Sequence, residues 1–125
     1  MIEAEIYSRI VGETDTPLTY AVVPQGETGL WSTYFVVSET PSSTIPLATS
    51  QTVRLQVDTY STDLEEAQTV ATEIESALVG WTSQTILCVR RTQRRTIYEK
   101  LTGSDGIRHR VSMDYRLKTD SGTGN

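Results

Sequence analysis

The chain has 125 residues, enough for one domain with a buried core but few for two. It holds no run that approaches the ~18 consecutive apolar residues of a membrane span, and its single cysteine excludes an internal disulfide bond. Its formal net charge of −5 conceals an asymmetry, because residues 1–79 carry a net charge of −10 and residues 80–125 a net charge of +5. Opposite charges on the two halves suit either pairing within the domain or head-to-tail contacts between copies that close into a ring.

The N-terminal part of the chain predicts a short helix, a loop and a short strand. Isoleucine recurs at every fourth position over residues 2–11, and acidic residues occupy the first turn, where they suit the helix dipole. Residues 12–19 lack periodicity and are predicted to form a loop, with Gly12 as the helix stop. Residues 20–23 are predicted as a short strand that ends at the turn 24–26.

Next come a predicted strand and a polar segment. Residues 31–38 alternate and are rich in aromatic and β-branched side chains, which predicts a strand. Residues 39–51 contain two prolines and six serines or threonines, which predicts a long loop or arm. This segment is interpreted either as a mobile loop or as an arm that orders against a partner, through Ile45 and Leu47.

Residues 52–81 predict a strand followed by an amphipathic helix. Apolar side chains at alternate positions, beginning at Val53, indicate a half-buried strand. Thr62 and Glu65 have the spacing of a capping box at the start of the helix, and Gly80 is a predicted left-handed stop. Apolar residues at spacings of three and four then form one helical stripe: Leu64, Ala67, Ala71, Ile74 and Leu78.

The last part of the chain predicts two strands joined by a glycine-rich turn. Apolar residues 85–89 lead into an arginine-rich segment, and residues 107–118 alternate along their whole length. The short turn at 100–106 favours an antiparallel hairpin. We therefore predict one α/β (α+β) domain over residues 1–118, with an antiparallel or mixed sheet of four or five strands and two helices on one face. Residues 119–125 are predicted to be a disordered tail.

The sequence lacks the common signatures of catalytic and cofactor sites. It contains no Walker-type glycine loop, dinucleotide-binding fingerprint or H-E-x-x-H motif. Cys88 and His109 are the one Cys–His pair, but both are predicted on the inward, apolar sides of strands, where a cysteine packs as a small hydrophobic residue. One histidine and one cysteine also leave a zinc site short of ligands. We therefore expect no enzyme activity, no metal and no cofactor.

Arginines and glutamates are the remaining candidate functional residues. We predict a subunit interface in which arginines of the hairpin of one copy meet glutamates on the helix of the next: Arg90, Arg91, Arg94 and Arg95 with Glu65, Glu66, Glu73 and Glu75. Three alternatives stay open. The glutamates would be a solvated helix face, the arginines would pair with acids of their own domain, or the arginines would contact nucleic-acid phosphates, which a pI near 4.8 disfavours.

Several segments, in their order and spacing, carry a family resemblance. They are the turn Val-Val-Pro-Gln-Gly at 22–26, the strand Ser-Thr-Tyr-Phe-Val-Val at 32–37, the run Arg-Leu-Gln-Val-Asp-Thr-Tyr at 54–60, the helix end Ala-Leu-Val-Gly at 77–80 after Ala67, and the closing strand at 109–117. Together they make the chain similar to the tail completion (tail terminator) proteins of long-tailed bacteriophages and related tail-like particles. It departs from that family in its long Ser/Thr/Pro loop and its arginine-dense hairpin strand.

The resemblance implies an α/β subunit of a ring, expected to be hexameric, that caps the head-proximal end of the tail tube. Such a ring stops tube polymerisation and provides the surface to which the head or neck joins. The implied partners are further copies of the chain, the tail tube protein and a head–tail connector or neck protein. DNA is implied only as transient cargo through the lumen, and no membrane is involved. The implied location is the tail of the virion, after assembly in the host cytoplasm.

The polar face of the predicted sheet is the candidate lining of this lumen. Its mixed charges are expected to avoid a tight grip on DNA: Arg54, Asp58, Arg108, Arg110, Asp114 and Arg116. Alternative functions stay open at this point. They are a head-completion, neck or minor tail protein of the same particle, a small non-catalytic adaptor that binds one protein partner, and an enzyme that uses Cys88 and His109.

Overall fold

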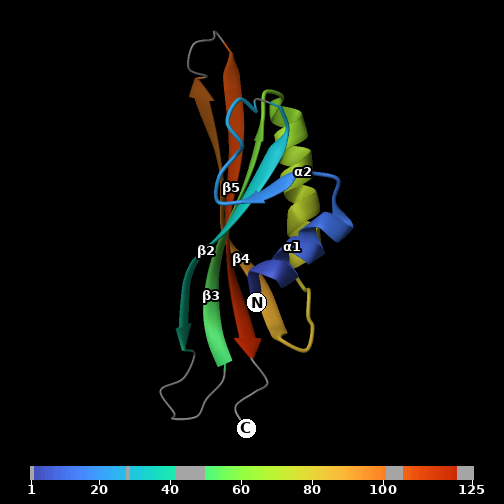
Figure 1. The fold of residues 1–125 in the computed structure, drawn as a ribbon, viewed down its shortest axis with the longest axis vertical. Coiled ribbons are helices and arrows are strands. Elements are labelled where there is room, and N and C mark those ends of the chain that lie inside the picture. Colours follow the sequence, from blue (N-terminus) through green and yellow to red (C-terminus); the bar gives the residue numbers. More distant parts are fainter. Residues whose placement is uncertain (1, 28, 42–49, 101–105, 121–125) are drawn as a thin grey trace.

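The computed structural model of the chain describes residues 2–27, 29–41, 50–100 and 106–120 (Figure 1). The described residues form one mixed five-stranded sheet in the order β1-β2-β3-β5-β4, in which β1 is parallel to β2 and the other neighbours are antiparallel. Both helices cover one face of this sheet, which confirms the predicted α+β fold; the other face is called the open face here. The elements in chain order are α1 (Ile2–Glu13), β1 (Leu18–Tyr20), β2 (Trp31–Pro41), β3 (Ser50–Ser61), α2 (Leu64–Leu78), β4 (Ile86–Lys100) and β5 (Ile107–Asp120).

The hydrophobic core lies between α2 and the alternate positions of the two central strands. The predicted inward residues of β3 are almost fully buried, and the ladder pairs them with equally buried residues of β5: Val53 with Leu117, Leu55 with Tyr115 and Val57 with Met113. The predicted helical stripe is buried as well, except that Leu64, the first residue of α2, is 38% exposed. Burial of these alternating positions is what holds the two layers together.

α2 is capped differently from the prediction. Its N-cap is Asp63, whose Oδ1 accepts a hydrogen bond of 3.0 Å from the backbone N–H of Glu65. The capping box predicted from Thr62 is therefore wrong. The hydroxyl of Ser61 also accepts from the Asp63 N–H and donates to a glutamate in the first turn of α2. At the other end of α2, Gly80 has a φ of +86°, which confirms the predicted left-handed stop.

Strand pairing reaches into both segments that were predicted to be irregular. β2 continues to Pro41 and β3 begins at Ser50, so the ends of the predicted arm at 39–51 are paired strand. Ile45 and Leu47 lie outside the described residues. β5 continues to Asp120, whose ladder partner is Ser50, so the predicted disordered tail begins two residues too early.

The N-terminal elements also differ slightly from the prediction. α1 runs through Gly12 and ends at Glu13, because a glycine in the last turn costs little when the helix is held by buried isoleucines. β1 covers residues 18–20 rather than 20–23. The strand stops there because Ala21 adopts a positive φ of 69°, which takes the backbone out of the β region.

Candidate functional site

The arginine-rich segment lies on β4, an edge strand of the sheet that pairs with β5. Between the ladder partners of Asp114 and Tyr115, β4 carries one extra residue, Thr92, and this is a β-bulge. The bulge interrupts the alternation of side chains, so that residues three positions apart share a face. Two arginines therefore face α2, Arg91 and Arg94, and two lie on the open face, Arg90 and Arg95.

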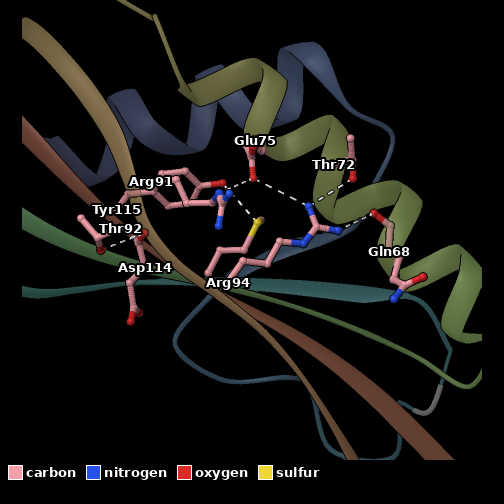
Figure 2. Close-up of polar contacts among 9 residues, drawn as sticks. Gln68, Thr72, Glu75, Arg91, Thr92, Arg94, Asp114 and Tyr115 are labelled. Carbon is pink, nitrogen blue, oxygen red and sulfur yellow. Dashed lines mark hydrogen bonds and ion pairs between the residues drawn. The ribbon is translucent and has the colours of Figure 1, made fainter.

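Arg91 and Arg94 converge on Glu75 of α2 (Figure 2). Nε of Arg91 lies 2.7 Å from Oε1 of Glu75, and Nη1 of Arg94 lies 3.7 Å from the same oxygen. Arg94 also donates from Nη1 to the Thr72 hydroxyl and from Nη2 to the Gln68 carbonyl oxygen, both at 3.2 Å. These contacts reach three successive turns on one side of α2 and attach the edge strand to the helix.

Tyr115 of β5 lies beside this cluster and is 1% exposed (Figure 2). Its hydroxyl donates a hydrogen bond of 3.3 Å to Sδ of Met113. Burial, and after it the negative charge of Glu75, raises the pKa of Tyr115 well above its ordinary value, although the nearby guanidinium groups act in the opposite direction. The phenol is therefore held in its protonated form within the core.

The candidate interface residues fall into two groups. Glu75, Arg91 and Arg94 have partners in their own chain, so internal pairing accounts for them. The remaining candidates are exposed, although Glu66 accepts a hydrogen bond from the Ser61 hydroxyl: Glu65, Glu66, Glu73, Arg90 and Arg95. The structure thus separates residues that the sequence had grouped together, because the bulge on β4 assigns neighbouring arginines to opposite faces.

Three arginines form one row across the open face. The register of β3 with β5 places Arg54 directly opposite Arg116, and the register of β4 with β5 places Arg90 opposite the same Arg116. All three side chains are exposed. We call these three residues the arginine row. Lys118, two residues further along β5, is also exposed and lies opposite Cys88. The row is not apparent in the sequence because it depends on the register of three strands.

Two hollows border the arginine row. Polar residues that line the first are Arg54, Thr92, Gln93, Asp114 and Arg116, and those that line the second include Cys88, Arg90, Arg116 and Lys118. Asp114 is the acidic residue of this lining. Among the described residues, no ion pair joins the arginine row or Lys118 to a carboxylate. The centre of the open face therefore carries a local excess of positive charge.

The rest of the candidate lumen lining is engaged within the chain. The guanidinium carbons of Arg108 and Arg110 lie 4.7 and 5.9 Å from the ring centroid of Tyr60, which are cation–π distances. Nε of Arg110 is also 4.0 Å from a carboxylate oxygen of Glu99. Asp58 is 6% exposed, and its carboxylate accepts hydrogen bonds from the Gln56 amide. Asp58 is therefore buried rather than exposed on this face, and the lining of a lumen stays a prediction.

The Cys–His pair is not assembled. Cys88 is exposed on the open face, not buried as predicted, because a register irregularity between Ile86 and Cys88 shifts the alternation of β4. His109 lies opposite Tyr98, near the other end of the hairpin. Within the described ranges, no group of three or more potential metal ligands is clustered. No helix in the same ranges is long and apolar enough to cross a membrane.

The described residues form an α+β fold with a helix-covered face and an arginine-bearing open face. No protein-family model matches the chain, and no curated protein sequence matches it either. A similar solved structure is a chain of the virion of a native gene transfer agent (GTA) particle. It aligns with a TM-score of 0.64 over 93% of this chain and 92% of that chain, at 14% sequence identity. The likeness shows that the two chains share a fold.

Proposed function

We propose that the chain is a structural protein of a phage-like particle. The supporting observation is the fold that it shares, over 93% of its length, with a chain of a gene transfer agent virion. The sequence resemblance to tail completion proteins supports the same class independently, since it depends on motifs and not on the fold. More specifically, we propose a ring, with six copies as the expected number, that caps the head-proximal end of a tail tube.

The proposed mechanism is geometric and involves no catalysis. One surface of the ring matches the last ring of the tube, while the opposite surface does not repeat it, so that polymerisation ends there. The opposite surface then receives the head or neck. A closed ring requires a heterologous contact, in which two different surfaces of the same chain meet. The exposed glutamates of α2 and the exposed arginines of β4 are two such surfaces with opposite charges.

The structure narrows the residues proposed for this contact. Glu75, Arg91 and Arg94 already bind one another, so we assign the contact to Arg95 on the edge strand and to the exposed glutamates of the next copy, foremost Glu73. The open face would then line the lumen through which DNA passes. Partners are the tube protein and a neck or connector protein, in the virion after assembly in the host cytoplasm.

The direct test adds the purified chain to polymerising tube protein and images the products by negative-stain electron microscopy. We expect six-fold rings at one end of tubes whose growth has stopped. Tubes that grow unchanged in the presence of the chain would contradict the terminator role. Rings of twelve that bind heads and leave tubes unchanged would instead assign the chain to the neck of the particle.

A further inference from the structure

We propose that the open face carries a binding site for phosphodiester chains, centred on the arginine row (Arg54, Arg116 and Arg90) and extended by Lys118. The inference goes beyond the proposed function, because it depends on the surface of a single copy and holds whether or not the chain forms a ring. It also replaces the expectation of a mixed-charge face that grips DNA weakly. The charges are mixed along the strands, but the register places three arginines directly opposite one another, with Asp114 at the border of the row.

The arginine row opposes the stability of the sheet. Side chains directly opposite one another on neighbouring strands lie roughly 5 Å apart at Cβ, and like charges in that position are destabilising. Arg116 faces such a like charge on both sides. Four other arginines of the chain have glutamate partners within 4.0 Å, namely Arg9, Arg91, Arg94 and Arg110, whereas the described residues provide no such partner for the row.

Protection of the sheet edge does not explain the row. Charged side chains are common on edge strands, where they prevent pairing with a second sheet. That purpose accounts for Arg90 and Arg95 on β4. It does not account for Arg54 on β3 or Arg116 on β5, because both strands are flanked by neighbours in the sheet. A function of the exposed face itself is the remaining explanation for three arginines in register.

The chemistry of the row suits phosphate groups. Guanidinium groups bind phosphate oxygens with two parallel hydrogen bonds, and they lose less hydration than ammonium groups when they do so. The hollow beside the row adds the neutral polar side chains of Thr92 and Gln93, which can contact the same backbone. The described part of the open face presents strands rather than a helix that could enter a groove, so binding is expected to be independent of base sequence.

The net charge of −5 does not override this local field. The exposed glutamates of α2, such as Glu65 and Glu73, belong to the helical layer on the other side of the sheet. Packed layers lie roughly 10 Å apart, and the Debye length at physiological ionic strength is about 8 Å, so these charges are largely screened from a ligand on the open face. Asp114, which borders the row, is one negative charge against the four positive charges of the row and Lys118.

The test measures the binding of a fluorescently labelled DNA duplex by anisotropy at several salt concentrations. With three or four phosphate contacts, the logarithm of the binding constant is expected to fall with the logarithm of salt concentration with a slope of about −3. Arg116→Gln should weaken binding roughly 5- to 10-fold and make this slope about one unit shallower. The matched control is Lys100→Gln, which removes one charge from the exposed end of β4 and should leave affinity unchanged.

Alkylation of Cys88 provides a second measurement of binding at the same site, because Cys88 is the single cysteine and lines a hollow beside the row. Bound duplex should slow its alkylation in the wild type and much less in Arg116→Gln. Equal affinities of wild type and Arg116→Gln, or no binding at low salt, would overturn the proposal. So would poly-glutamate binding as tightly as DNA, which would assign the row to an acidic polypeptide. Light scattering on the same samples reports ring formation separately, so either proposal can fail alone.

Discussion

Glu75 is the residue through which the edge strand β4 is attached to the helical layer. Its carboxylate binds Arg91 and Arg94, whose side chains remain 37% and 25% exposed to solvent. Partly exposed pairs of this kind are each worth only about 0.2–1 kcal/mol. The stronger local effect is on Tyr115, because a buried phenol next to a carboxylate is held protonated.

The raised pKa of Tyr115 predicts a loss of stability at high pH. The unfolded chain releases this proton near pH 10.0, whereas the folded chain retains it, so rising pH favours the unfolded state above that value. The contribution of Tyr115 is present in full below pH 10.0 and is lost as the pH rises further. In urea denaturation, the midpoint of the wild type should therefore fall above pH 10.0, and that of Tyr115→Phe should fall less steeply.

A suitable control for this experiment is Tyr98→Phe, because Tyr98 is 72% exposed. It should keep the pH dependence of the wild type. Tyr34, whose pKa is also raised by burial and then by Glu3, leaves a residual dependence in Tyr115→Phe. Identical slopes for Tyr115→Phe and the wild type would show that the phenol does not titrate as its environment indicates.

At the level of the elements, mutations at the N-terminus of α2 can distinguish the observed cap, Asp63, from the predicted cap, Thr62. Asp63→Ala removes the side chain that accepts from the Glu65 N–H and should lower the free energy of unfolding by about 1 kcal/mol. Thr62→Ala should change it by less than about 0.5 kcal/mol, since Thr62 is exposed before the cap. Chemical denaturation of both variants measures the difference. A larger loss in Thr62→Ala would restore the predicted capping box.

Because Thr92 is an extra residue in the β4 ladder, we expect the fold to tolerate its deletion. Without Thr92 this part of the strand becomes regular, and Arg91 and Gln93 keep their ladder partners and faces, so deletion of Thr92 should cost about 1 kcal/mol. Deletion of Gln56 from β3 is the control. β3 is paired on both sides, and a shift of one residue would turn its buried side chains to the open face, at a cost above about 4 kcal/mol. Thermal unfolding of the two variants would show equal losses if the bulge had no such role.

The sequence predicted the elements whose periodicity is strong and missed what depends on pairing between strands. The alternation from Val53 and the stripe through Ile74 follow from burial of one face, which leaves a repeat in the sequence itself. The bulge at Thr92 leaves no such repeat, because it is defined by what lies opposite. If β4 is assumed to be regular, Arg91 and Arg94 are expected on opposite faces, and Arg90 is not expected opposite Arg116.

At the scale of the whole molecule, the opposite charges of the two halves of the sequence become opposite charges of two surfaces. The exposed acids of α2 lie on the helical side, and the unpaired arginines lie on the open face and at the β4 edge. A surface of one sign that meets a surface of the other sign on the next copy produces a heterologous contact, which closes into a ring when the rotation is right.

Arg95→Glu and Glu73→Arg should each assemble poorly, since each places like charges across the proposed contact. A 1:1 mixture should recover assembly. In an alternating ring, every junction then joins opposite charges: one kind of junction has the original pair, and the other has the same pair reversed. Alternation closes only with an even number of copies, which a ring of six satisfies. Light scattering at low salt measures the mass of each variant and of the mixture.

Lys100→Glu is the matched control for this exchange, because it reverses a charge on the same strand away from the proposed contact. It should assemble like the wild type and should not rescue Glu73→Arg. Recovery in the mixture of Arg95→Glu and Glu73→Arg, but not with Lys100→Glu, would identify a direct contact between positions 95 and 73 of neighbouring copies, because long-range attraction alone would respond equally to reversal at position 100. If the mixture stays as poorly assembled as its components, the contact lies elsewhere.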